Sequence, residues 1–320
     1  MFYEIDIFAE NTIRPDMHIF ITGGTGLIGS ALIRTLLQQG HVITVLTRNQ
    51  AKAEKKLGTA VRYCTSLESL KSMDKYDAVI NLAGEPIAGK RWTKKQKERL
   101  CDSRWDITRR LTELIKTGDS PPSVYISGSA IGYYGAQADN LLTEIADSHD
   151  EFTYQLCKKW EGLAVAAESP NTRVCISRTG VVLSRKGGML AMLSMPFKLG
   201  LGCVLGKGAT IYFVDSYTRY GQWYNISSQY ARGKGGVFNF TAPNPVTNKR
   251  FANILSSTLY RPQIFKIPSF LIKLVMGESA TILLDGQRAI PPQHLTDLHY
   301  RFTFEHLDEA LRNLMKGKKK

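Results

Sequence analysis

A tyrosine and a lysine stand four residues apart in the stretch FTYQLCKKWEG, at Tyr154 and Lys158. Residues i and i+4 of an α-helix share one face, so the ammonium group would lie beside the phenol. A neighbouring cation favours the phenolate and lowers a phenol pKa that starts at about 10, toward the range useful for proton transfer. The pair therefore predicts an acid/base site, although two residues on a solvated helix face would show the same spacing.

Two serines, Ser127 and Ser129, precede this helix in the strand-like segment SVYISGSA. They would lie at the carboxyl edge of a parallel sheet, where α/β folds bind ligands. Ser129 would hold a substrate oxygen while Tyr154 exchanges a proton with it and Lys158 tunes the phenol. We take Ser129, Tyr154 and Lys158 as candidate catalytic residues. The alternative is a helix that only shapes a nucleotide pocket.

A glycine turn lies between the first predicted strand, HIFIT, and the first predicted helix. Gly23, Gly26 and Gly29 allow a tight turn and a close approach of the backbone to a pyrophosphate. The charge of the pyrophosphate would sit at the helix N-terminus, where unpaired N–H groups and the helix dipole favour an anion. The candidate cofactor-binding residues of this turn are Gly23, Gly24, Thr25, Gly26, Leu27, Ile28 and Gly29.

The end of the second predicted strand indicates which dinucleotide binds, because an acid there holds a ribose 2′-hydroxyl and a base accommodates a 2′-phosphate. This chain has Thr47 and Arg48 at that place and Lys52 shortly beyond. We therefore expect NADP(H) to be preferred, with NAD(H) possible. Arg48 as an ordinary surface residue is the alternative.

Short apolar runs alternate with helical segments from Met17 to about residue 186. This alternation predicts an α/β fold of the Rossmann type, a doubly wound parallel sheet, followed by a smaller C-terminal substrate-side lobe. We expect the NAD(P)-binding core in residues 17–186 and the lobe in residues 187–316. Residues 1–16 would be an extension of doubtful origin, and residues 317–320 a basic tail.

Composition excludes several classes of protein. The net charge is +14, and the runs KRWTKKQKER and KGKKK are strongly basic, but no nucleic-acid-binding motif accompanies them. The five cysteines form no C-x-x-C pair, and the six histidines have no metal-ligand spacing. No apolar run is long enough to cross a membrane. We expect a cytoplasmic protein with no metal, no nucleic acid and no membrane partner.

The motifs TGGTGLIGS, INLAGEPIAGKRW, SGSAIGYYG, LCKKWE, RTGVVLS and NFTAPNPVTN together resemble the extended or atypical short-chain dehydrogenase/reductase superfamily. More narrowly, they resemble the bacterial "epimerase family" proteins with a C-terminal domain of unknown function, over about Met17 to Leu314. The resemblance implies a Rossmann core, matches Ser129, Tyr154 and Lys158 to the catalytic serine and Y-x-x-x-K, and adds the candidate cofactor-binding residues Asn81, Leu82, Ala83, Gly84 and Arg178. Many members of the branch that this chain resembles have different residues, often basic ones, at the positions of this tyrosine and lysine.

These observations predict an NADP(H)-dependent oxidoreductase or epimerase that acts on a sugar nucleotide or on a small carbonyl or hydroxyl compound, with a homodimer possible. A non-catalytic NADP(H)-binding sensor or scaffold is the alternative. The loop with Glu85, Lys90, Arg91 and Trp92 could meet a substrate phosphate or carboxylate, or be a plain surface loop. Further candidates carry less weight: Tyr133 and Tyr134 as pocket-lining or packing residues, and His294, His299 and His306 as structural or exposed residues.

The resemblance fails between Gly208 and Gly236, where a polar, tyrosine-rich run replaces a Trp-Ile-His and Asp pattern. Codons can be chosen for Ala209 to Gln222 that encode this pattern when they are read one base out of frame. Our hypothesis is a pair of compensating frameshifts that bound residues 209–232. Resequencing the gene tests it, because codons that cannot be shifted into that pattern would contradict it.

Overall fold

The computed structural model describes residues 16–137, 141–208, 211–212, 214–216, 235–284, 288–289 and 304–316. The frameshift hypothesis falls mostly outside these residues, as do residues 1–15 and the tail 317–320. Most of the chain from Met17 onward can therefore be compared with the predicted order of elements.

The core is an all-parallel sheet of seven strands in the order β12-β7-β5-β4-β1-β2-β3. The strand order reverses between β1 and β4, and a ligand crevice forms at the carboxyl ends of the strands on either side of such a reversal. The predicted Rossmann-type fold is thus confirmed. The strands are β1 (His18–Thr22), β2 (Val42–Leu46), β3 (Arg62–Cys64), β4 (Ala78–Asn81), β5 (Val124–Ala130), β7 (Arg173–Thr179) and β12 (Gly236–Phe240).

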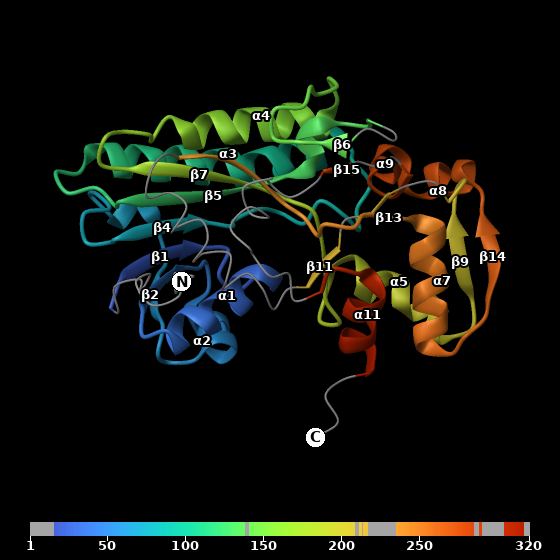
Figure 1. The fold of residues 1–320 in the computed structure, drawn as a ribbon. Coiled ribbons are helices and arrows are strands. Elements are labelled where there is room, and N and C mark those ends of the chain that lie inside the picture. The colour runs from blue at the N-terminus through green and yellow to red at the C-terminus, as the bar shows by residue number, and fades with distance from the viewer. Residues whose placement is uncertain are drawn as a thin grey trace, which may run out of the picture.

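Helices cover both faces of this sheet (Figure 1). Ile19 and Ile21 of β1 point to the face covered by α1 (Leu27–Gln38) and are fully buried there. Phe20, between them, points to the other face, which α3 (Lys94–Thr117) and α4 (Phe152–Val165) cover. This alternation along one strand is why both faces carry an apolar core. The helix α2 (Gln50–Leu57) follows β2.

The seventh strand comes from beyond residue 186. β12 pairs in parallel with β7, with Phe238 opposite Ser177 in the register. The chain therefore leaves the sheet after β7, builds part of the second lobe, and returns to complete the sheet. The two predicted segments, 17–186 and 187–316, share one sheet.

The C-terminal lobe has its own core, in which α5 (Gly188–Lys198), α7 (Asn248–Leu259) and α11 (Leu307–Lys316) pack together. A two-stranded sheet of β9 (Gly202–Leu205) and β14 (Gln263–Ile267) lies beside α7 (Figure 1). The remaining elements are short: β6 (Leu141–Leu142), β8 (Val181–Leu183), β10 (Ile211–Tyr212), β11 (Val214–Ser216), β13 (Val246–Thr247), α8 (Ser269–Met276), α9 (Thr281–Leu284), β15 (Arg288–Ala289), and 3₁₀ turns at Leu67–Ser69, Ile131–Tyr134 and Gly277–Ala280.

Candidate functional site

The glycine turn after β1 can be built only from glycine at two of its positions. Gly23 has φ +68°, and a Cβ there would lie 2.3 Å from the backbone oxygen of Leu82. A Cβ on Gly29 would lie 2.4 Å from the backbone oxygen of Gly23. Such contacts are impossible, so these glycines let β1, the turn and α1 approach one another closely. At Gly26 the corresponding contact, 3.0 Å to the Gly23 oxygen, is less severe.

The N-terminus of α1 presents the features of an anion site. Its N-cap residue, Gly26, is exposed and offers no side-chain cap, and the first turn contains no acid. Lys56 of α2 donates from Nζ to the backbone oxygen of Thr25 at 2.6 Å, which places a cation beside the turn. Leu27 faces the start of α5, because a Cβ on Gly188 would lie 3.6 Å from its Cδ2 atom. Gly24 is buried, whereas Thr25 and Ile28 are partly exposed.

The end of β2 contains no acid. Thr47 accepts the Asn49 N–H at 3.3 Å, and Asn49 in turn caps α2 by accepting the Lys52 N–H at 2.9 Å. These bonds fix the backbone on both sides of Arg48, whose side chain is exposed. The guanidinium group is thus available at the place where a dinucleotide's adenosine ribose lies in such folds.

The end of β4 is braced from within by Asn81, which is fully buried. Its Oδ1 accepts the Thr22 hydroxyl at 2.6 Å, and its Nδ2 donates to the Thr108 hydroxyl at 2.8 Å. The side chain therefore ties β1 and β4 together and sets the path of Leu82, Ala83 and Gly84 beside the glycine turn. Ala83 is buried and Gly84 is exposed.

Ser129 lies in a buried polar network rather than on an open surface. Its hydroxyl donates to Glu161 Oε1 at 2.5 Å, and Glu161 pairs with Arg178 through two bonds of 2.9 Å. Arg178 Nη1 donates to the Tyr134 hydroxyl at 3.1 Å, and Tyr134 donates to Asn239 Oδ1 at 2.6 Å. The carboxylate raises the pKa of the Arg178 guanidinium against the opposing effect of burial. The network joins β5, α4, β7 and β12.

Sequence reasoning missed Glu161, which is only 7% exposed. A visible indication existed: Glu161 directly follows Trp160 and lies four residues after Cys157, on the apolar side of the helix segment. A carboxylate there requires a buried partner, because an unpaired buried charge is very unfavourable. The structure supplies Arg178, which was predicted to contact a cofactor.

Tyr154 and Lys158 lie side by side at the start of α4. The Lys158 ammonium is 5.2 Å from the centroid of the Tyr154 ring. A hydrogen bond with Ser148 and then one with Lys158 lower the pKa of the Tyr154 phenol below its ordinary value. Tyr154 also meets Tyr133 edge-on at 5.4 Å between centroids, and the Arg178 guanidinium stacks on Tyr133 at 3.4 Å.

The turn of α4 that meets Ser129 is not the turn that carries Tyr154. Cys157, 3% exposed, and Glu161 lie one turn apart on the inner face, and Ser129 approaches both. Tyr154 lies seven residues before Glu161, about two turns nearer the start of α4, where it meets Tyr133. Lys158 is rotated by about 100° from Cys157 and is exposed. The structure thus brings Tyr154 together with Lys158, and Ser129 together with Glu161. Within the described residues no hydrogen bond joins Ser129 to Tyr154.

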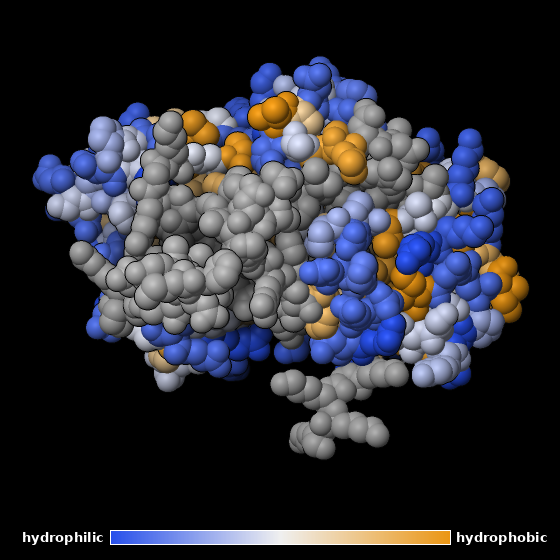
Figure 2. All heavy atoms as spheres, in the orientation of Figure 1, coloured by the Kyte–Doolittle hydropathy of each residue, from blue (hydrophilic) through white to orange (hydrophobic). Residues whose placement is uncertain are grey.

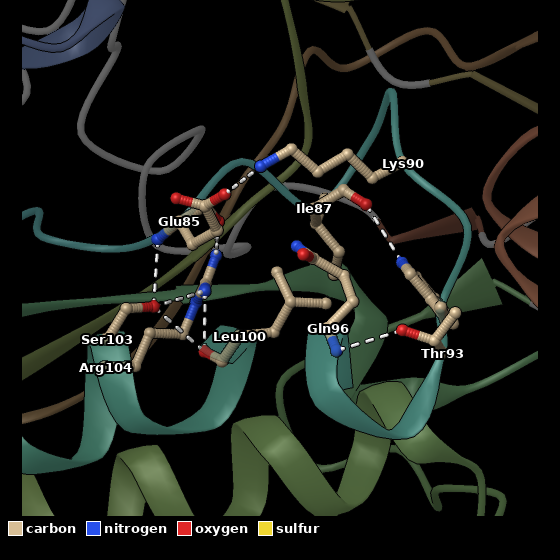
Figure 3. A network of polar contacts seen from close by, with 9 residues as sticks. Glu85, Ile87, Lys90, Thr93, Gln96, Leu100, Ser103 and Arg104 are labelled. Atoms are coloured by element: carbon tan, nitrogen blue, oxygen red, sulfur yellow. Dashed lines mark hydrogen bonds and ion pairs between the residues drawn. The ribbon is translucent and has the colours of Figure 1, made fainter. Parts of the chain in front are cut away.

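The loop between β4 and α3 folds back onto α3 (Figure 3). Glu85 accepts from Lys90 Nζ at 2.7 Å, and this bond lowers the pKa of the Glu85 carboxyl. Arg104 donates to the Glu85 backbone oxygen at 3.0 Å, and Trp92 donates to the Ile87 oxygen at 3.0 Å. The loop is therefore ordered by its own contacts, with the Glu85 carboxylate engaged within it.

Other candidates lie apart from this region or outside the described residues. His306 is exposed, whereas His294 and His299 lie outside the described residues. In the described part of the chain no group of three or more His, Cys, Asp or Glu residues could hold a metal ion, and none of the five cysteines, all described, forms a disulfide.

Two family models match the chain. One, described as "NAD dependent epimerase/dehydratase family", matches residues 19–212. The other, described as "Domain of unknown function (DUF1731)", matches residues 267–314 and so begins at the end of β14.

Curated relatives span nearly the whole chain, and two of them come from a plant and a bacterium. "Epimerase family protein SDR39U1 homolog, chloroplastic" from Arabidopsis thaliana is 33% identical over 317 residues, which cover 97% of this chain and 90% of the relative. "Epimerase family protein YfhF" from Bacillus subtilis is 33% identical over 309 residues, which cover 95% of this chain and 99% of the relative.

Solved structures share the fold, and two of them are more than 25% identical to this chain. Human epimerase family protein SDR39U1, solved with NADPH, has a TM-score of 0.85 and 29% identity, covering 94% of this chain and 100% of that chain. A nucleoside-diphosphate sugar epimerase from Corynebacterium glutamicum has a TM-score of 0.72 and 28% identity, covering 92% of this chain and 57% of that chain.

Proposed function

We propose that this chain, which belongs to the NAD-dependent epimerase/dehydratase family, is an NADP(H)-dependent oxidoreductase or epimerase acting on a sugar nucleotide or a small carbonyl or hydroxyl compound. The observation that carries the proposal is the glycine turn, where backbone contacts at Gly23 and Gly29 exclude any side chain beside the uncapped N-terminus of α1. The similarity to a human protein solved with NADPH supports the same cofactor.

The residues of this region fit a dinucleotide phosphate. The first N–H groups of α1 would bind the pyrophosphate, because they point away from the helix and the helix dipole favours an anion. Arg48 would pair with the 2′-phosphate, and the Lys56 ammonium beside Thr25 would add to the positive field. Ala83 and Gly84 would lie along the cofactor beyond the turn. When bound, the nicotinamide supplies hydride transfer to or from a substrate carbon.

Tyr154 is the proposed proton carrier. In the reducing direction its phenol gives a proton to the substrate oxygen, and in the oxidising direction the phenolate takes that proton back. Ser148 and Lys158 stabilise the phenolate, as the lowered pKa of Tyr154 indicates. Lys158 also remains exposed, which lets it reach a ribose hydroxyl.

The geometry narrows the role proposed for Ser129. Its hydroxyl proton is engaged by Glu161 at 2.5 Å, so only its oxygen lone pairs are left for a substrate. Ser129 would therefore accept a hydrogen bond from a substrate hydroxyl rather than donate one to a carbonyl oxygen. If Ser129 positions the substrate, this hydrogen bond favours binding of the substrate as an alcohol rather than as a carbonyl compound.

Arg178 is better explained as a brace than as a cofactor ligand. Its Nε and Nη2 atoms donate to Glu161, and its Nη1 atom donates to Tyr134 and to the Glu144 backbone oxygen. With the side chain 4% exposed, little of it can reach a cofactor. Its flat guanidinium instead supports the ring of Tyr133, which contacts Tyr154.

Turnover with Tyr154→Phe tests the proposal. NADPH oxidation would be followed across aldehydes and ketones, and epimer formation from nucleotide sugars would be followed by chromatography, because epimerisation leaves no net change in the cofactor. NADPH affinity would be measured separately by fluorescence titration. Loss of a general acid should lower turnover by about 10²- to 10⁴-fold and leave NADPH affinity within about twofold. Tyr260→Phe is the matched control, because Tyr260 is 77% exposed in the C-terminal lobe.

Undiminished turnover by Tyr154→Phe would contradict the assignment of the proton carrier. Tight NADPH binding by the parent protein without turnover of any compound would contradict the enzyme and favour a sensor or scaffold. These two outcomes are distinguishable, since one concerns a residue and the other the whole activity.

A further inference from the structure

Most of the net positive charge of this chain lies in its C-terminal half. Residues 185–277 contain twelve Lys and Arg but a single acid, Asp215, in a chain whose net charge is +14. This excess is additional to the two basic runs identified in the sequence. Residues 241–277 contain five Lys and Arg and no acid at all. A stretch of sequence this long with charge of one sign predicts an anionic partner.

Exposed apolar side chains gather in the same stretch. Among the described residues fourteen large hydrophobic side chains are exposed, and six of them lie between residues 264 and 275. We call these six, with their basic neighbours Lys266 and Lys273, the β14–α8 surface. The six are Ile264, Phe265, Phe270, Leu271, Leu274 and Val275.

The attachment of α8 to the lobe explains why these side chains point outward. Ile272 is 7% exposed and packs, together with Met276, against Leu205 and Ala280. Phe270 and Leu274 are each two positions from Ile272, which places them on the opposite side of the helix, and they are 67% and 69% exposed. Figure 2 shows apolar side chains along the edge of the molecule where Figure 1 draws β14.

We propose that the β14–α8 surface docks on an anionic lipid bilayer, which replaces the expectation of no membrane partner drawn from the sequence. Phe270, Leu274 and Ile264 would enter the boundary between head groups and acyl chains, while Lys266 and Lys273 contact acidic head groups. With eight residues, α8 is too short to span a bilayer, and no described helix is long and apolar enough to do so. Docking is therefore peripheral.

The shape and charge of this surface favour lipid over protein. Its side chains protrude singly from a strand and a short helix, and a fluid interface accepts protruding groups without a complementary surface. A second copy of this chain would bring two strongly basic lobes together, and their repulsion opposes a dimer through this face. The surface overlaps the start of the domain of unknown function at residue 267, which gives that segment a role.

Sedimentation of the full chain with vesicles tests the proposal. Vesicles of phosphatidylcholine alone are compared with vesicles of phosphatidylcholine and phosphatidylserine, at low and high salt. We expect binding only to the mixed vesicles, weakened by salt. Leu274→Ser should lower the partition coefficient about tenfold, because part of a leucine side chain leaves the interface. Lys273→Gln should lower it about fivefold.

Matched variants elsewhere separate this surface from general stickiness. Ile145→Ser removes a side chain that is 94% exposed outside the C-terminal lobe, and Lys95→Gln removes an exposed charge from the basic run on α3. Both should bind vesicles as the parent does. Circular dichroism and thermal melting confirm that each variant is folded.

Three results would overturn the proposal. One is the absence of binding to the mixed vesicles. Another is binding that Lys95→Gln weakens and Leu274→Ser does not, which would assign the charge effect to α3. The last is a dimer in light scattering that Leu274→Ser dissociates without any lipid binding, which would make a second copy the occupant.

Discussion

Replacing Glu161 by glutamine tests the buried network beneath the proposed site. The change keeps the shape of the side chain but leaves the Arg178 guanidinium without its counter-ion, in a place where the side chains of Arg178 and Glu161 are 4% and 8% exposed. The glutamine amide would also direct N–H groups at the guanidinium, where two hydrogen bonds of 2.9 Å now exist. Removing one partner of such a buried pair costs about 3–5 kcal/mol.

The free energy of unfolding would be measured by urea denaturation at pH 7, with thermal melting as a second probe. Glu113→Gln is the control, because the Arg110–Glu113 pair on α3 has side chains that are 32% and 52% exposed. An exposed pair contributes about 0–1 kcal/mol, so this control should unfold close to the parent. The double variant Glu161→Gln/Arg178→Met should cost less than the sum of the single variants, since no unpaired charge remains buried.

Equal midpoints for Glu161→Gln and Glu113→Gln would refute the reasoning. So would strict additivity in the double variant, because it would show that the two side chains do not interact. Either result would mean that the Glu161–Arg178 pair does not hold α4 against β7.

Three further predictions concern the turn, the thiols and the phenol. Gly29→Ala should destabilise the fold by about 1–3 kcal/mol and abolish NADPH binding, because the new Cβ would lie 2.4 Å from the Gly23 backbone oxygen. Gly162→Ala in α4 is the control: its Cβ would meet nothing within 4 Å, so this variant should bind NADPH normally. Ellman's reagent at pH 8 should titrate at most Cys64 and Cys203 in the native protein and all five thiols after denaturation. The reason is that Cys101, Cys157 and Cys175 are buried, and burial raises the pKa of Cys157 to about 12. Rapid reaction of all five thiols in the native protein would contradict this prediction. In the oxidising direction, Lys158→Met should move the midpoint of the rise in turnover with pH upward, toward about 10, because Ser148 and Lys158 hold the Tyr154 pKa below that value; an unchanged midpoint would show that Tyr154 does not titrate in that step.

The glycine turn and the sheet could be predicted from the sequence because both are encoded locally. Gly23, Gly26 and Gly29 follow one strand and open one helix, and the alternation of apolar runs with helices fixes the fold class. The comparisons confirm the family that these motifs resemble. Pairing of β12 with β7 could not be read in this way, because the two strands are more than fifty residues apart and only their contact reveals the pair.

Helix spacing predicted the contact of Tyr154 with Lys158 but not the orientation of α4. That orientation follows from the packing of Leu156 and Trp160 and from the burial of Glu161 against Arg178. Since Arg178 is on β7, its pairing with Glu161 depends on how α4 lies on the sheet. A pattern within one helix cannot contain that information, and so the partner of Ser129 was missed.

The most direct test of the account is a pair of binding isotherms for NADPH and NADH with the parent protein and with Arg48→Ala. If the glycine turn and the exposed Arg48 form a site for a 2′-phosphorylated dinucleotide, the parent should bind NADPH at least about tenfold more tightly than NADH, and Arg48→Ala should lose that difference without losing NADH affinity. Equal affinities in the parent would contradict the preference. Failure of the parent to bind either dinucleotide would contradict the proposed function itself.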